Sequence, residues 1–393
     1  MKKVFNLLVS FVLIAGFSAC SKDDSGNDSG NQQVPKNPVP SADYKGLAFI
    51  SSGESTVRLA QVGTPYEISL EYSTDESHWK PYTIGETITL ADSTFLLFRS
   101  GEHKNRKFSK DDENYYHFEI SGPISAQGNI MSLLNRDFST PLTKYAFFAL
   151  FEGCTSLLSA PELPTTTMEY GCYAQMFSGC TALKYAPELR AEVLAMKCYQ
   201  HMFRGCSALT SAPELPATTM EQGCYFGMFS ECTELTSAPE LPAKALAYNC
   251  YGMMFKGCSA LTYVPDLPAT EMRIYCYNSM FANCTSLKFA PELPATRLDM
   301  GCYHCMFEGC TSLTSAPELP ATELVSNCYE FMYKDCHNLR YVIGLFTTEP
   351  SEKTTKDWLS GVAASGTFIK SKKATWDVTG AHGIPEGWKI ETW

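Results

Sequence analysis

The chain has 393 residues, which is too long for one ordinary compact domain, so two or three structural units are expected. It contains 31 basic and 42 acidic residues, a net charge of -11, and neither a Lys/Arg-rich run nor a nucleic-acid-binding motif. This composition argues against nucleic acid as a partner. The hydrophobic fraction of 45% is high enough to form buried cores.

The first 20 residues have the features of an export signal. Lys2 and Lys3 precede an apolar run, from Val4 to Phe17, that is too short to remain as a membrane span. The run ends in Phe-Ser-Ala-Cys at 17–20, which resembles the bacterial lipobox. The resemblance implies that residues 1–20 are a lipoprotein signal peptide and that Cys20 becomes lipidated. Ordinary secretory cleavage is the alternative.

Residues 21–43 are rich in Ser, Gly, Asn, Asp and Pro and have almost nothing apolar to bury, so they are predicted to be a disordered tether. The tether begins with Ser-Lys-Asp-Asp at 21–24. This resembles a short acidic signal that sends lipoproteins of Bacteroidetes-type bacteria to the outer face of the outer membrane. The implied location is the cell surface, with a lipid anchor in the outer membrane, although any flexible polar tether has a similar composition.

Residues 44–135 contain short runs in which apolar and polar side chains alternate, separated by clusters of turn-forming residues. The clearest runs are 66–72, 87–90 and 116–120. A period of two with frequent turns predicts a small all-β, sandwich-like domain. Its expected role is a spacer that lifts and caps the rest of the chain, and the alternative is a carbohydrate- or protein-binding domain.

Residues 136–345 contain a 26-residue repeat without insertion or deletion. One cysteine series follows it through Cys154, Cys180, Cys206, Cys232, Cys258, Cys284, Cys310 and Cys336, and a second through Cys172, Cys198, Cys224, Cys250, Cys276, Cys302 and Cys328. A fixed period of this length predicts a solenoid, because one repeat cannot bury its own apolar face and must stack on the next.

Each repeat is predicted to have an extended half and a helical half. Leucines at positions such as Leu157 and Leu163 indicate one strand of a parallel sheet per repeat. In the other half, Cys172, Met176 and Cys180 have the i, i+4, i+8 spacing of one helix face. The residue before the second cysteine is expected to be left-handed and to close that helix; it is Gly179, Gly205, Gly257, Gly309, Asn283 or Asp335, with Glu231 as an exception. The expected N-caps are Thr166, Thr218, Thr270, Thr296 and Thr322.

The pattern Cys-x-x-Leu, followed by a Leu-Pro step and an aromatic residue before the next Cys, resembles the BspA-like leucine-rich repeats of bacterial surface proteins. The resemblance covers roughly residues 145–345. It implies an α/β solenoid of leucine-rich-repeat type, with a parallel strand and a short helix in each 26-residue repeat. It also implies adhesion outside the cell, without catalysis.

The repeat cysteines are expected to be buried free thiols that act as small hydrophobic residues. Two cysteines eight residues apart on one helix are beyond disulfide reach, and the two series give an odd number. Cys305, three residues after Cys302, forms an extra Cys-x-x-Cys; drift on a helix face is the simpler interpretation, and redox or metal chemistry is the alternative.

Two series of exposed positions are the candidate ligand-binding residues. The acidic series is Glu162, Glu188, Glu214, Glu240, Asp266, Glu292 and Glu318. Ordinary solvation and hydrogen bonds can offset the repulsion between these carboxylates, and the alternative is a line of sites for Ca²⁺ or a basic partner. The aromatic series is Tyr185, Tyr263, Phe289 and Tyr341. These residues either contact a protein or glycan ligand or simply cover neighbouring backbone.

Residues 346–393 lack the repeat and contain four of the five tryptophans, so they are predicted to be a C-terminal cap. The seven histidines show no metal-ligand spacing, and no phosphate-binding loop or nucleophile elbow appears. We therefore expect a non-enzymatic surface lipoprotein, without cofactor or metal, that binds a protein or glycan on host or bacterial surfaces. The alternative is a structural or nutrient-capture lipoprotein whose repeats act as a scaffold.

Overall fold

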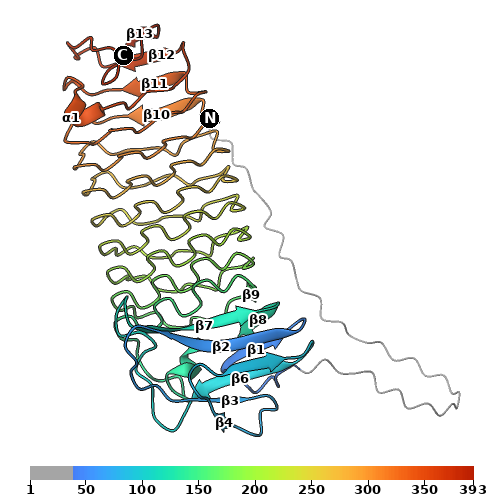
Figure 1. Ribbon diagram of the computed structural model, residues 1–393. Coiled ribbons are helices and arrows are strands. Elements are labelled where there is room, and N and C mark those ends of the chain that lie inside the picture. Colours follow the sequence, from blue (N-terminus) through green and yellow to red (C-terminus); the bar gives the residue numbers. More distant parts are fainter. Residues whose placement is uncertain (1–38) are drawn as a thin grey trace, which may run out of the picture. The chain divides into compact units, whose positions relative to one another are not determined.

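The computed structural model describes residues 39–393 (Figure 1). The predicted signal peptide, Cys20 and most of the predicted tether lie outside the described residues. Within 39–393 the secondary structure is almost entirely strand and turn, with one 3-10 helix, η1 (Ile130–Leu133), and one α-helix, α1 (Glu352–Thr355). The structure consists of β-sheets followed by a solenoid whose 26-residue turns are here called coils.

Two packed β-sheets lie at the start of the described residues, and the first of them ends on a strand of the first coil. Their strand orders are β4-β3-β6-β1-β8-β9 and β5-β2-β7. Phe49 and Phe98 of the first sheet pack against Phe118 of the second, with ring centroids 5.1 and 5.5 Å apart. The strands are β1 (Leu47–Ser51), β2 (Ser55–Val62), β3 (Leu70–Ser73), β4 (Lys80–Pro81), β5 (Thr87–Leu90), β6 (Phe95–Ser100), β7 (Tyr115–Ser121), β8 (Ile124–Gln127) and β9 (Leu157–Ser159).

The alternation at 87–90 and 116–120 corresponds to β5 and β7, whereas the run at 66–72 becomes a strand only at Leu70. Side chains take the place of strand partners in the earlier part of that run. The N–H of Tyr66 donates to the hydroxyl of Tyr116 at 3.2 Å, and the N–H of Ser69 donates to Oδ1 of Asn105 at 2.9 Å. Backbone N–H groups that already donate hydrogen bonds to side chains do not require a neighbouring strand as a partner.

The β-sheets are joined to the first coil through backbone bonds and a common core. β8 pairs in parallel with β9 of the first coil. The N–H of Phe118 donates to the carbonyl of Leu150, and that of Phe108 to Ala146, both at 2.7 Å. One hydrophobic core runs from the sheets through the coils, so the sheets cover the first coil and satisfy its backbone.

The part of each coil equivalent to residues 171–180, here called the turn segment, contains consecutive tight turns and no helix. Alternate N–H groups bond back within the coil, as from Met176 to the carbonyl of Tyr173 at 3.3 Å. The intervening groups donate to the next coil, as from Phe177 to the carbonyl of Met202 at 2.9 Å. The predicted helix in each repeat is therefore wrong, and the α/β leucine-rich-repeat type is not supported. The threonines predicted as N-caps have no helix to cap: Thr166, Thr218, Thr270, Thr296 and Thr322.

Every fourth residue of a turn segment has left-handed backbone, with φ of 57° at Gly171, 56° at Gln175 and 75° at Gly179. The turns therefore repeat every four residues, close to the 3.6 residues of an α-helix. Over one short segment the two periods bury the same positions, which explains the wrong prediction. The left-handed conformation expected before the second cysteine is confirmed at Gly179, Gly205, Gly257, Gly309, Asn283 and Asp335, and Glu231 adopts it as well, with φ of 65°.

Two stacked aromatic ladders fill the core of the coils. The tyrosine ladder has ring centroids 5.8–6.1 Å apart and contains Tyr173, Tyr199, Tyr225, Tyr251, Tyr277, Tyr303 and Tyr329. The phenylalanine ladder has a spacing of 5.4–5.7 Å and contains Phe151, Phe177, Phe203, Phe229, Phe255, Phe281, Phe307 and Tyr333. Every ring in the two ladders is no more than 1% exposed. Each such pair adds about 0.5–1.5 kcal/mol beyond the burial of its surface.

The predicted parallel sheet is regular only near the two ends of the solenoid. β9 pairs with β8 at the first coil, and β10 (Ser315–Leu319), β11 (Tyr341–Gly344), β12 (Thr367–Lys370) and β13 (Lys389–Thr392) form a parallel sheet in that order. Between these ends the coils share isolated parallel bridges, such as Tyr185 to Ser211 and Ser237 to Tyr263. Prolines in this part of each repeat have no N–H to donate, so a continuous ladder cannot form.

The sequence repeat ends at Leu345, but the coil backbone continues beyond it. Tyr329 and Tyr333 donate to the carbonyls of Thr354 and Trp358, at 3.1 and 2.8 Å, in the pattern of the earlier coils. The ring of Trp358 continues the tyrosine ladder by stacking on Tyr329 at 6.2 Å. Its Nε1 donates to the carbonyl of Gly383 at 2.8 Å, which fixes the last segment over the final coil.

Candidate functional site

The segment equivalent to residues 211–216, here called the proline segment, has the sequence Ser-Ala-Pro-Glu-Leu-Pro or a close variant in each repeat. Its side chains alternate between the core and solvent. Leu215 and Ala217 are 3% and 1% exposed, whereas Glu214 and Pro216 are exposed. The predicted inward leucine is confirmed at this position. The alternation places one carboxylate per coil on a surface called here the proline face.

Grooves lie between successive coils on the proline face. The Phe289 groove, between residues 289–294 and 315–320, has a volume of about 530 Å³. The Pro213 groove, between 212–216 and 239–242, has a volume of about 330 Å³. The Arg190 groove, between 160–164 and 187–190, has a volume of about 300 Å³. All three occur at equivalent positions of the repeat, so the repeat itself produces them.

The missing proline N–H groups explain why these grooves stay open. No backbone hydrogen bond joins residues 290–294 to 316–320, although both segments are fully described. On the turn segments of the same two coils, by contrast, Tyr277 donates to Cys302 at 3.1 Å and Phe281 to Met306 at 2.9 Å. The coils are thus joined by regular hydrogen bonds along the turn segments, whereas along the proline segments they share only isolated bridges, such as that between Phe289 and Ser315.

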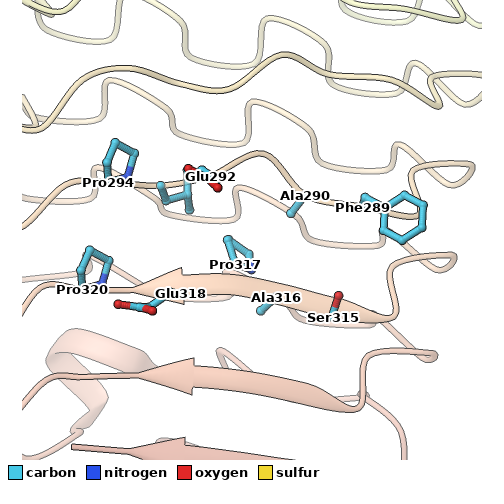
Figure 2. A pocket seen from close by; sticks show the side chains of 10 residues that line it. Phe289, Ala290, Glu292, Pro294, Ser315, Ala316, Pro317, Glu318 and Pro320 are labelled. Carbon is cyan, nitrogen blue, oxygen red and sulfur yellow. The ribbon is translucent and has the colours of Figure 1, made fainter. Parts of the chain in front are cut away.

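Figure 2 shows the Phe289 groove, with the phenylalanine ring at one end and Pro294 and Pro320 at the other. Glu292 and Glu318 extend from adjacent coils between these ends. The remaining lining is formed mainly by Ala, Leu and Pro side chains. The groove therefore combines an apolar floor and an exposed aromatic ring with two carboxylates.

The four aromatic residues predicted as ligand contacts are open to solvent. The exposed fractions are 66% for Tyr185, 56% for Tyr263, 71% for Phe289 and 38% for Tyr341. The alternative, that these rings simply cover neighbouring backbone, accounts poorly for the three that are more than half exposed. Tyr263 and Phe289 belong to successive coils, while Tyr185 and Tyr341 lie in separate parts of the stack.

All seven residues of the acidic series are exposed, which keeps their carboxylates hydrated. Two of them have close partners. Asp266 accepts the backbone N–H of Glu292 at 3.3 Å, as the simpler interpretation of the series expected. Glu188 pairs with Nη2 of Arg190 at 2.5 Å, and this hydrogen bond holds the pKa of its carboxyl below the usual range. Within residues 39–393, no group of three or more His, Cys, Asp and Glu residues has the arrangement of a metal site.

The sixteen cysteines of residues 39–393 are all free and buried. In the series from Cys154 to Cys336, each thiol lies against a backbone carbonyl of an earlier segment. Sγ of Cys206, for example, donates to the carbonyl of Phe177 at 3.1 Å, and Sγ of Cys232 donates to that of Phe203 at the same distance. Burial raises the pKa of Cys206 to about 12. These thiols therefore stay protonated at neutral pH and connect coils instead of acting as nucleophiles.

Cys305 differs from the repeat cysteines. It occupies a left-handed position of the turn segment, with φ of 53°, and is 8% exposed. Its Sγ lies 3.8 Å from Nε2 of His304, and burial raises the pKa of its thiol to about 12. A thiol with a raised pKa is a poor nucleophile, which favours drift over redox chemistry at this position.

Sequence reasoning missed the grooves and the Arg190 pair. The two prolines of the proline segment could have predicted the grooves, because two residues without a backbone N–H within four positions prevent close pairing of neighbouring strands. Sequence reasoning also missed three exposed apolar side chains of the repeats that lie outside the proline face, Val193, Tyr248 and Met300, with exposed fractions of 61%, 45% and 40%. The residue types at these three positions vary from coil to coil, so no sequence pattern indicated them.

No helix of the described residues is long and apolar enough to cross a membrane. The chain matches no family model, no curated protein and no solved structure.

Proposed function

We propose that this chain is a non-enzymatic binding module of the BspA-like type, displayed on a bacterial surface and adhering to a host or bacterial macromolecule through its proline face. In this proposal a lipid on Cys20 anchors the chain in the outer membrane, and residues 21–43 hold the folded part away from the lipid. The ligand is a protein or a glycan.

The exposure of the aromatic series on the proline face is the observation that supports this function best. Aromatic side chains are enriched among residues that dominate binding energy, because they bury a large area and lose little conformational entropy. Phe289 is 71% exposed and lines the largest of the three grooves described above. A large exposed aromatic residue beside an apolar groove forms the kind of apolar patch that marks a binding site.

The regular backbone of the coils also suits binding. Hydrogen bonds of 2.7–3.1 Å join each turn segment to the next, as in Asn283 to Glu308 and Tyr277 to Cys302. The proline face is therefore presented on a backbone that needs little ordering when a ligand binds. A pre-ordered surface lowers the entropic cost of association.

Substitutions test this function better than deletions, because the β-sheets and the coils share one core and would not fold separately. Four coils have serine at the aromatic position: Ser159, Ser211, Ser237 and Ser315. The test variant is therefore Tyr185→Ser, Tyr263→Ser, Phe289→Ser and Tyr341→Ser combined. The control combines Val193→Thr, Tyr248→Gln and Met300→Ser, each taken from the same position of another coil.

The measurement is binding of the purified wild type and both variants to arrayed extracellular-matrix proteins and bacterial surface glycans. We expect a ligand of the wild type to bind the test variant at least about tenfold more weakly, because hot-spot aromatics each contribute about 2 kcal/mol. The control variant should bind like the wild type. Equal binding by all three would reject the proline face and favour a scaffold that presents the β-sheets.

A further inference from the structure

The lining of the Phe289 groove offers hydrogen-bond acceptors and apolar surface, with few donors. Its ten lining residues include Glu292 and Glu318 but neither lysine nor arginine. No backbone N–H of the described residues donates to the carbonyls of residues 290–294. A ligand that fits this groove must therefore supply donors, positive charge and apolar contact together.

The two carboxylates of the groove have no cationic partner in the chain. The ion pairs found among residues 39–393 include neither Glu292 nor Glu318. Both are exposed and lie on adjacent coils, where their charges repel each other. A cation placed between them would remove that repulsion and gain two attractive contacts.

The Arg190 groove shows what occupies this position when the chain supplies its own cation. Arg190 replaces the second proline of the proline segment and corresponds to Pro294 and Pro320 in the Phe289 groove. Its guanidinium lies 2.5 Å from Glu188 and lines the groove. An arginine is therefore accommodated beside a carboxylate of the acidic series, and the Phe289 groove lacks it.

We propose that the Phe289 groove binds an extended polypeptide segment containing arginine or lysine, with a cationic side chain between Glu292 and Glu318 and an apolar side chain against Phe289. This inference rests on the proposed binding function and deepens it by naming the partner class. Five residues of each coil line the groove, within a span of six positions that measures about 20 Å in extended chain, so the matching segment has about six residues. A neutral glycan fits less well, because each of its hydroxyl oxygens also accepts hydrogen bonds and the groove offers few donors.

The test uses a fluorescein-labelled hexapeptide of alternating leucine and arginine, with a peptide of leucine and citrulline as the neutral control probe. Binding is followed by fluorescence anisotropy on the folded protein. The test variant combines Glu292→Gln and Glu318→Gln. The matched control combines Glu162→Gln and Glu188→Gln. These two residues line the Arg190 groove, and their substitution lowers the negative charge of the protein by the same amount.

We expect the arginine peptide to bind the test variant about tenfold more weakly than the wild type, because two exposed ion pairs are together worth roughly 1–2 kcal/mol. The control variant should change the affinity less than about twofold. A second variant, Pro294→Arg, should weaken binding at least as much as the test variant does, since its guanidinium would pair with Glu292 as Arg190 does with Glu188. Because this variant keeps both carboxylates, a loss of binding would result from an arginine that occupies the groove and not from removal of the carboxylates.

Equal losses in the two glutamine variants would overturn the inference, because they would show attraction to net charge alone. Binding of the citrulline peptide as tightly as the arginine peptide would overturn it as well. If a neutral glycan binds through the aromatic series while the arginine peptide does not bind, this inference fails and the proposed function stands. If no ligand depends on the aromatic series, the proposed function itself fails. Thermal unfolding of each variant verifies that the fold is intact.

Discussion

The buried thiols predict that this protein unfolds in mildly alkaline solution. Fifteen of the sixteen cysteines in residues 39–393 are no more than 1% exposed. Desolvation by burial raises the pKa of each of these thiols above its ordinary value of 9.0, for example to about 12 for Cys206 and Cys258. The folded state therefore keeps these protons at a pH where the unfolded chain releases them.

The sign of the effect follows from the direction of the shift. Because the folded pKa is the higher one, the stability that each buried thiol contributes is fully present below the unfolded pKa of 9.0 and is lost as the pH rises toward the folded pKa, which is about 12 for Cys206. Each thiol lowers the free energy of unfolding by about 0.4 kcal/mol at pH 9 and about 1.4 kcal/mol at pH 10. Fifteen thiols give about 6 and about 20 kcal/mol, compared with a typical total stability of 5–15 kcal/mol. Unfolding is therefore expected between pH 9 and 10.

The assay is urea unfolding followed by circular dichroism at several pH values from 7 to 10, with a phosphine reductant present throughout. A variant combining Cys232→Ala and Cys258→Ala is the control. It should be less stable at pH 7, because the lost side chains leave cavities, but between pH 7 and 10 its stability should fall by about 1.4 kcal/mol less for each thiol removed. A free energy of unfolding that stays constant from pH 7 to 10 would refute the account of the buried thiols.

Three further predictions concern the coils. Glu231→Gly should stabilise the protein by roughly 1 kcal/mol, since φ is 65° at this residue; Gly205→Ala should destabilise it by a similar amount through φ alone, because no atom lies within 3.7 Å of the added carbon. Urea unfolding measures both, and a loss of stability in the glycine variant would contradict the left-handed assignment. A thiol-specific chromogenic reagent should modify the buried cysteines of residues 39–393 only after denaturation, and rapid modification of the native protein would contradict their burial. Phe255→Ala should cost about 3–5 kcal/mol, because it interrupts the phenylalanine ladder at a ring that is 0% exposed, and a loss below 1 kcal/mol in urea unfolding would argue against continuous stacking.

The repeated architecture could be predicted from the sequence, but the conformation of its cysteine-containing half could not. Cys172, Met176 and Cys180 are buried as the pattern indicated. A period of four and a period of 3.6 differ by less than half a residue per turn, so three positions do not distinguish them. The left-handed residues between them, such as Gln175, gave no warning because many residue types occupy that position, from Gly227 to Phe331.

The candidate surface was predicted in part. Alternation located Glu214 outside and Leu215 inside, and the exposed aromatic residues followed from the same register. The grooves form where backbone hydrogen bonds between coils are missing, and a pattern of side chains does not show this directly. The prolines of the proline segments, two in most repeats, are the reason for the missing bonds. The hydrogen bonds of the thiols, such as that from Cys206 to the carbonyl of Phe177, depend on the stacking of successive coils, which brings together residues 29 apart in sequence. The continuation of the coil to Trp358 likewise depends on backbone bonds and not on repeated side chains.

Protease treatment of intact cells tests the central claim, that the solenoid is displayed outside the cell to bind a partner, most directly. Cells that produce the protein are treated with protease and blotted with an antibody raised against the coils, with a periplasmic protein as the control. We predict that the coil signal is lost while the periplasmic control survives. Full protection of the coils in cells whose lysate is readily digested would contradict surface display and, with it, adhesion.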